Sequence, residues 1–91
     1  NFTEALAVIK DSNPLPSVCG RVCTHPCESA CRRNAIDGAV NINAIKRFVA
    51  DWDTFQLEPY KPVCQPDTGH KVAIVGSGPA GLTAAWFLRR M

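Results

Sequence analysis

Four cysteines recur at every fourth position of one short stretch, and they are the residues of this sequence best suited to chemistry. The stretch reads CGRVCTHPCESAC, and its cysteines are Cys19, Cys23, Cys27 and Cys31. Thiolates are soft, anionic ligands, and iron–sulfur clusters and zinc are both bound by four of them. The crowding of four cysteines into thirteen positions therefore predicts a metal centre.

The spacing favours an iron–sulfur cluster over zinc. Structural zinc sites usually pair two C-x2-C units across a longer finger, whereas this stretch has three successive gaps of three residues. Zinc and a thiol or disulfide role remain open as alternatives. His25 lies beside Pro26 among the cysteines, and we expect a solvent-facing loop residue rather than a ligand. Cys64 stands alone and is expected to be a free thiol.

A second motif with chemical meaning is the glycine-rich run GSGPAG, which follows the apolar, β-prone segment 71–75 and precedes a predicted helix over 82–88. A strand, this turn and a helix in that order form the fingerprint of a dinucleotide-binding unit. Gly76 permits the tight turn, Gly78 lets the backbone approach a pyrophosphate, and Gly81 allows close packing of helix on strand. The predicted nucleotide-binding residues are Gly76, Ser77, Gly78, Pro79, Ala80 and Gly81.

The elements around the cysteines are predicted to be helical. Apolar residues at helical spacing indicate a helix over 3–10, and segment 15–18 is predicted to be an extended lead-in to Cys19. Pro26 prevents one continuous helix through the motif, so we expect a loop with the first two cysteines and a helical turn over 27–33 with the others.

The next predicted helix begins at Asn41 or Asn43 and ends near Phe55. Its predicted core residues are Ile45, Phe48, Val49, Trp52 and Phe55, and its predicted outer residues are Lys46, Arg47, Asp51 and Asp53. Segment 58–70 is rich in proline and is predicted to be an extended linker.

The overall composition excludes several classes of function. A net charge of +2 with scattered basic residues gives no sign of nucleic-acid binding, and no apolar run approaches the roughly 20 residues that span a bilayer. The start of the chain lacks the features of a signal peptide, so we expect a cytoplasmic protein. No grouping of serine, histidine and carboxylate residues indicates hydrolysis, and no catalytic residue is predicted. A start without methionine and an end inside a predicted helix indicate a piece of a longer protein.

Both motifs, in this order, resemble the small subunit of glutamate synthase and its relatives, which include the N-terminal part of dihydropyrimidine dehydrogenase. The likeness covers essentially the whole chain, from NPLP before the cysteines, through the cysteine stretch, to VAIVGSGPAGL. The resemblance implies a mainly α fold, in which a helical [4Fe-4S] domain precedes the first strand, turn and helix of a Rossmann-like FAD domain. The implied divisions are 1–57 for the helical domain, 58–70 for the linker and 71–91 for the start of the FAD domain.

The resemblance also implies an NAD(P)H- and FAD-dependent oxidoreductase that passes electrons to a partner subunit or domain, with the four cysteines as cluster ligands. In some relatives the equivalent cysteines are shared between two clusters, one of which is completed by a Gln or Glu on the following helix. Lys46 stands at that position here, and a protonated lysine is a poor ligand. The rival hypothesis is a non-enzymatic docking module, stabilised by zinc or by a cluster.

Overall fold

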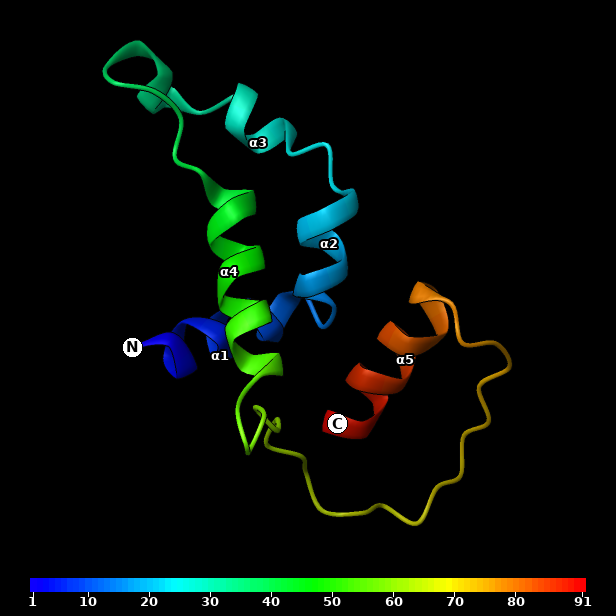
Figure 1. Cartoon of the computed structure of the whole chain (residues 1–91). Coiled ribbons are helices and arrows are strands. Elements are labelled where there is room, and N and C mark those ends of the chain that lie inside the picture. Colours follow the sequence, from blue (N-terminus) through cyan, green and yellow to red (C-terminus); the bar gives the residue numbers. More distant parts are fainter.

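All regular elements of the protein are helices, and no β-strand is present (Figure 1). This computed structural model describes all of residues 1–91. Its elements are α1 (Phe2–Ser12), α2 (Pro16–Val22), α3 (Pro26–Ser29), the 3-10 helix η1 (Arg32–Ala35), α4 (Ile42–Thr54) and α5 (Pro79–Arg90). None of these helices combines the length and the apolar character needed to cross a membrane. The prediction of a mainly α protein is confirmed.

Helices α1 and α4 form where the apolar periodicity predicts them. The side chain of Asn1 caps α1 by accepting a hydrogen bond from the Glu4 backbone N–H at 3.2 Å, and the helix extends two residues beyond the predicted end at Lys10. Asn41 is the N-cap of α4, although its own side chain makes no capping bond. The segment between α4 and α5 contains no regular element, as its prolines predict.

The extended lead-in predicted over 15–18 is wrong, because α2 begins at Pro16 and carries Cys19. A proline restricts the residue before it, but at the first position of a helix its missing N–H costs nothing and its fixed φ suits the helix. Pro16 therefore starts a helix rather than preventing one. Pro26 does the same for α3, as predicted.

The core is small and lies where α1, α2 and α4 meet. Six of the 91 residues are buried, so each close contact between these helices matters for the fold. Leu6 of α1 is fully buried, and Val49 and Ala50 of α4 are buried with it. Gly20 of α2 is buried against α4, where a Cβ atom would come within 2.7 Å of the Arg47 Cβ. Glycine thus allows α2 and α4 to approach closely, as the two neighbouring ribbons in Figure 1 show.

We expect Gly20→Ala to destabilise the protein. The new methyl group would also lie 3.0 Å from the Arg47 Cα, which is backbone and cannot rotate away. Overpacking of this kind costs about 1–3 kcal/mol and outweighs the gain of about 1 kcal/mol in helix propensity. Urea denaturation followed by circular dichroism measures the difference. Gly78→Ala is the matched control, since nothing lies within 4 Å of its added Cβ; equal stability of both variants would contradict the close packing.

The buried face of α4 differs from the predicted one. Asp53, predicted to face outward, is 6% exposed, whereas Phe48 and Phe55, predicted to be core, are 57% and 85% exposed. Phe48 packs edge-on against Phe2, with ring centroids 5.4 Å apart, but its other side faces solvent. The positions of α1 and α2 decide which side of α4 is buried. The periodicity of apolar residues predicts that α4 has an apolar side, but not which of its residues the other helices cover.

A buried ion pair explains the place of Asp53. Its carboxylate accepts a hydrogen bond from Lys10 Nζ of α1 at 3.2 Å and another from the Tyr60 backbone N–H at 2.7 Å. The ammonium group of Lys10 also lies 5.4 Å from the centre of the Tyr60 ring and 5.8 Å from that of Trp86 in α5. One lysine therefore joins α1 to α4, to the start of the linker and to α5.

The strand predicted over 71–75 is wrong for this chain. The segment has no regular structure, and Val75 is fully exposed. A β-strand satisfies its backbone groups only by pairing with a neighbour, and this chain offers no second strand. The helix that follows does form, as α5, so the strand is the one part of the predicted strand, turn and helix that is missing.

Candidate metal centre

The four cysteines of the motif lie on four successive features of the backbone. Cys19 is inside α2 and half-buried, and Cys23 is the exposed residue that caps the C-terminal end of α2. Cys27 is exposed in α3, and Cys31 is the half-buried N-cap of η1. The prediction that Cys19 lies in a loop is wrong, since the helix reaches back to Pro16. Neither these four cysteines nor Cys64 form a disulfide, so all five thiols are free.

Polar groups surround several of the thiols. The Cys19 Sγ lies 3.5 Å from Asn13 Oδ1, and the Cys23 Sγ accepts a hydrogen bond from the His25 backbone N–H at 3.3 Å. Backbone N–H groups near Cys31, that of Val40 above all, hold the pKa of its thiol below the ordinary value, because they stabilise the thiolate. Thiolates are the form that binds metal, so this environment suits a ligand.

The structure does not bring these thiols together at one point. No three histidine, cysteine, aspartate or glutamate side chains of the chain converge in a way that could hold a metal ion. In Figure 1, the backbone of α3 and η1 extends away from the packed pair of α2 and α4. The donor chemistry suits an iron–sulfur cluster, while the ligand set of four cysteines stays a prediction.

The backbone between Cys23 and Cys27 turns sharply at His25. This residue has φ of 42°, in the left-handed region that side chains other than glycine rarely adopt. Its side chain is 47% exposed, and its Nδ1 lies 3.2 Å from Glu28 Oε2. His25 is thus a partly exposed residue of the turn, paired with a carboxylate rather than directed at the thiols. Lys46 lies on α4, half-buried.

The residues that connect the cysteine stretch to α4 are not predicted by any pattern in the sequence. Glu28 Oε1 accepts a hydrogen bond from the Asn43 backbone N–H at 2.8 Å, and Asn43 Nδ2 donates to the Gly20 carbonyl oxygen at 3.2 Å. From the sequence, Glu28 suggests only a favourable charge in the first turn of α3. Its contact with a helix fifteen residues further along the chain leaves no local pattern to detect.

The glycine-rich turn adopts the conformation expected of its glycines. Gly76 has φ of 105°, which glycine adopts readily, and Gly78 is the N-cap of α5. A Cβ atom on Gly81 would lie 2.5 Å from the Gly76 carbonyl oxygen, so the first turn of α5 packs tightly on the loop before it. Nucleotide binding by this turn stays a prediction.

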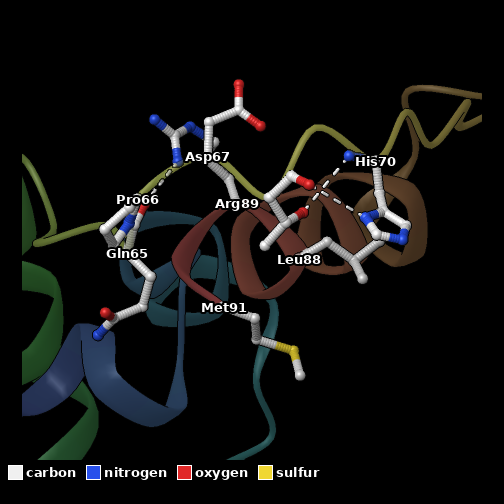
Figure 2. Close-up of a pocket in the computed structure, with 8 residues that line it drawn as sticks. Gln65, Pro66, Asp67, His70, Leu88, Arg89 and Met91 are labelled. Carbon is white, nitrogen blue, oxygen red and sulfur yellow. Dashed lines mark hydrogen bonds between the residues drawn. The ribbon is translucent and has the colours of Figure 1, made fainter.

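The pocket shown in Figure 2 belongs to neither motif. It has a volume of about 240 Å³ and lies between the linker and the C-terminal end of α5, with Asp67, His70 and Arg89 among its lining residues. The Arg89 guanidinium donates to the Gln65 carbonyl oxygen at 3.5 Å. The glycine-rich turn is at the opposite end of α5, so this pocket does not extend the predicted nucleotide site.

Comparison with known families decides which group of proteins carries this cysteine pattern. Residues 1–57 match the family model described as dihydropyrimidine dehydrogenase domain II, 4Fe-4S cluster. The chain belongs to this family. The resemblance seen in the cysteine and glycine motifs is thereby confirmed, and a [4Fe-4S] cluster is the cofactor of the domain that the family describes.

The relatives are named as oxidoreductases or their subunits. The chain is 51% identical over 89 residues to the NADPH-Fe(3+) oxidoreductase subunit beta of Geobacter sulfurreducens. The aligned region covers 96% of this chain and 13% of the relative. It is 43% identical to glutamate synthase [NADH] of Schizosaccharomyces pombe, over 98% of this chain and 4% of the relative. It is 40% identical to the NAD-dependent dihydropyrimidine dehydrogenase subunit PreT of Escherichia coli, over 93% of this chain and 21% of the relative.

Proposed function

We propose that this chain is the cluster-bearing part of a longer NAD(P)H- and FAD-dependent iron–sulfur oxidoreductase, in which it relays electrons between the flavin and a partner subunit or domain. The observation that carries the proposal is the free cysteine stretch inside the part of the chain that matches the 4Fe-4S family. Two of the named relatives are subunits of oxidoreductases that use a nicotinamide cofactor. The chain spans 13% of the first of them, so the activity of the whole protein is part of the proposal.

The proposed cluster ligands are Cys19, Cys23, Cys27 and Cys31. When bound, a [4Fe-4S] cluster supplies one-electron transfer, which complements a flavin that exchanges one or two electrons with nicotinamide hydride. The chain's own residues hold thiolates on a short, partly exposed segment, and the backbone N–H groups near Cys31 favour the anionic form. A cytoplasmic location belongs to the proposal, because reducing compartments keep such thiols free of disulfides.

The proposed division of the chain places the helical cluster domain at 1–57, the linker at 58–70 and the start of the FAD domain at 71–91. In the longer protein, segment 71–75 would gain neighbouring strands from outside this chain and could then become the first strand of a Rossmann-like sheet. The positive φ of Gly76 and the tight packing at Gly81 support this reading of the turn.

Gly78→Ala should lower flavin content in the longer protein without destabilising the fold. Gly78 has φ of −72° and open space around its missing Cβ, so alanine is tolerated by the chain itself. A pyrophosphate that approaches this backbone would meet the methyl group. Flavin released by heating, measured by fluorescence per chain, tests the expectation, with the thermal unfolding of the helical domain as the control. Unchanged flavin in the variant would contradict the proposed role of the turn.

The rival docking module is less well supported than the electron relay. A docking module stabilised by zinc or by a cluster accounts for four free thiols, but not for the glycine-rich turn at the start of α5. The named relatives are an oxidoreductase subunit, a glutamate synthase and a dehydrogenase subunit, each with a nicotinamide cofactor in its name. Iron and sulfide in place of zinc would exclude the zinc-stabilised module, and reduction of the cluster by NAD(P)H in the longer protein would separate the relay from a cluster-stabilised module.

A further inference from the structure

The first turn of α4 holds both halves of the cysteine stretch at once. The Asn43 backbone N–H donates to Glu28 Oε1 in α3 at 2.8 Å, while the Asn43 side-chain amide donates to the Gly20 carbonyl oxygen in α2 at 3.2 Å. Gly20 directly follows Cys19, and Glu28 directly follows Cys27. One residue of α4 thus bonds the immediate neighbours of two cysteines on two different helices.

The contact made by Glu28 also replaces a missing helix cap. The N-cap Asn41 makes no side-chain bond, so the N–H groups of the first turn of α4 need another acceptor. Glu28 supplies a carboxylate, which binds an N–H more strongly than a neutral acceptor and is favoured at the positive end of a helix. Its side chain is 17% exposed, and its second oxygen lies 3.2 Å from His25 Nδ1. The carboxylate is therefore fixed from two sides.

The same contacts extend toward the last cysteine. Asn34, in the helix that follows Cys31, donates its side-chain amide to the Glu28 carbonyl oxygen at 2.9 Å and to the Ser29 carbonyl oxygen at 3.3 Å. The end of α3 is thereby tied to η1. Backbone and side chain of Glu28 together connect η1, α3 and α4.

We infer that Glu28 and Asn43 are positioning residues for the metal centre, which set the distance and orientation of the Cys19 and Cys27 backbones through their neighbours. The inference rests on the proposed function, since it assigns these residues a task only if the cysteines bind a cluster. The two bonds can be broken separately. Asn43→Ala removes the side-chain bond to Gly20 but keeps the backbone N–H that binds Glu28. Glu28→Ala removes the bond to the Asn43 backbone N–H but keeps the bond between the Asn43 side chain and Gly20.

The test uses the full-length protein with its cluster and the variants Glu28→Ala, Glu28→Gln and Asn43→Ala. Glu28→Gln and Glu28→Ala both remove the charge, but only glutamine keeps an oxygen that can accept from Asn43. Matched controls are Glu58→Ala and Asn41→Ala, at exposed residues whose side chains make no hydrogen bond. The readouts are the rate of iron loss to a chelator and the electron paramagnetic resonance spectrum of the dithionite-reduced cluster.

Partners that orient metal ligands are typically worth about 10–100-fold in metal affinity, so we expect iron loss to accelerate about tenfold in Glu28→Ala and in Asn43→Ala, with an altered spectrum. Glu28→Gln keeps a neutral and weaker acceptor for the Asn43 N–H, so its rate of iron loss and its spectrum should lie closer to those of the wild type than to those of Glu28→Ala. A Glu28→Ala variant that behaves like Glu58→Ala would overturn the inference and leave the proposed function standing. So would a Glu28→Gln variant as defective as Glu28→Ala. Wild-type protein without iron would overturn the proposed function itself.

Discussion

Replacing Cys23 by serine is expected to remove most of the iron from the full-length protein. Cys23 lies between the two helices of the motif, and its thiol faces solvent, where serine is tolerated sterically. A serine hydroxyl is a harder and much less acidic ligand than a thiol, so it replaces a thiolate poorly at a soft metal centre. Replacing a residue that only hydrogen-bonds to a metal ligand typically lowers metal affinity about 10–100-fold, and the loss of a ligand itself should lower the affinity at least as much. Iron per chain after anaerobic purification measures it.

Cys64→Ser is the matched control, because it makes the same replacement of sulfur by oxygen at a cysteine outside the motif. The Cys64 thiol lies in the linker, half-buried, with the Pro62 carbonyl oxygen 3.7 Å away as its hydrogen-bond partner. This variant should keep the iron content of the wild type. Equal losses from Cys23→Ser and Cys64→Ser would show that the motif is not the ligand set.

Asp53→Ala is expected to cause the largest loss of stability among substitutions outside the cysteines. The change leaves the ammonium group of Lys10, which is 16% exposed, without its carboxylate, and it removes the acceptor of the Tyr60 backbone N–H. Breaking a buried ion pair on one side typically costs about 3–5 kcal/mol, since the remaining charge stays buried without compensation. Urea denaturation followed by circular dichroism measures the free energy of unfolding.

The control is Asp37→Ala, which breaks an exposed aspartate–arginine pair on the surface. Arg33 and Asp37 form short hydrogen bonds of 2.6 Å, yet their side chains are 57% and 52% exposed. Exposed pairs contribute little to stability, because water already solvates both charges. Equal destabilisation by Asp37→Ala and Asp53→Ala would contradict the claim that burial makes the Lys10–Asp53 pair important for stability.

The features that follow local rules could be predicted from the sequence. Apolar residues at helical spacing place α1 and α4, and Pro26 marks the start of α3 because proline fits the first turn of a helix. The cysteine and glycine motifs lead to the family, whose model matches residues 1–57. Pro16 obeys the same rule as Pro26, so its helix could have been predicted too.

The features that depend on tertiary contacts could not be predicted. Asp53 has the composition of a surface residue, and only the approach of Lys10 from a helix forty-three positions earlier makes its burial favourable. Glu28 gains its role from Asn43, fifteen positions away. Segment 71–75 has the composition of a strand, but a strand also needs partners, which composition cannot supply. The local sequence therefore determines which elements can form, and their neighbours decide how each is used.

The most direct test of the central claim is a comparison of iron, zinc and acid-labile sulfide in the full-length protein and in a variant with all four cysteines of the motif replaced by serine. We expect the variant to lack at least about four irons and four sulfides per chain, together with the cluster absorption near ~400 nm that dithionite bleaches. Zinc in place of iron, or equal iron in both proteins, would contradict the central claim.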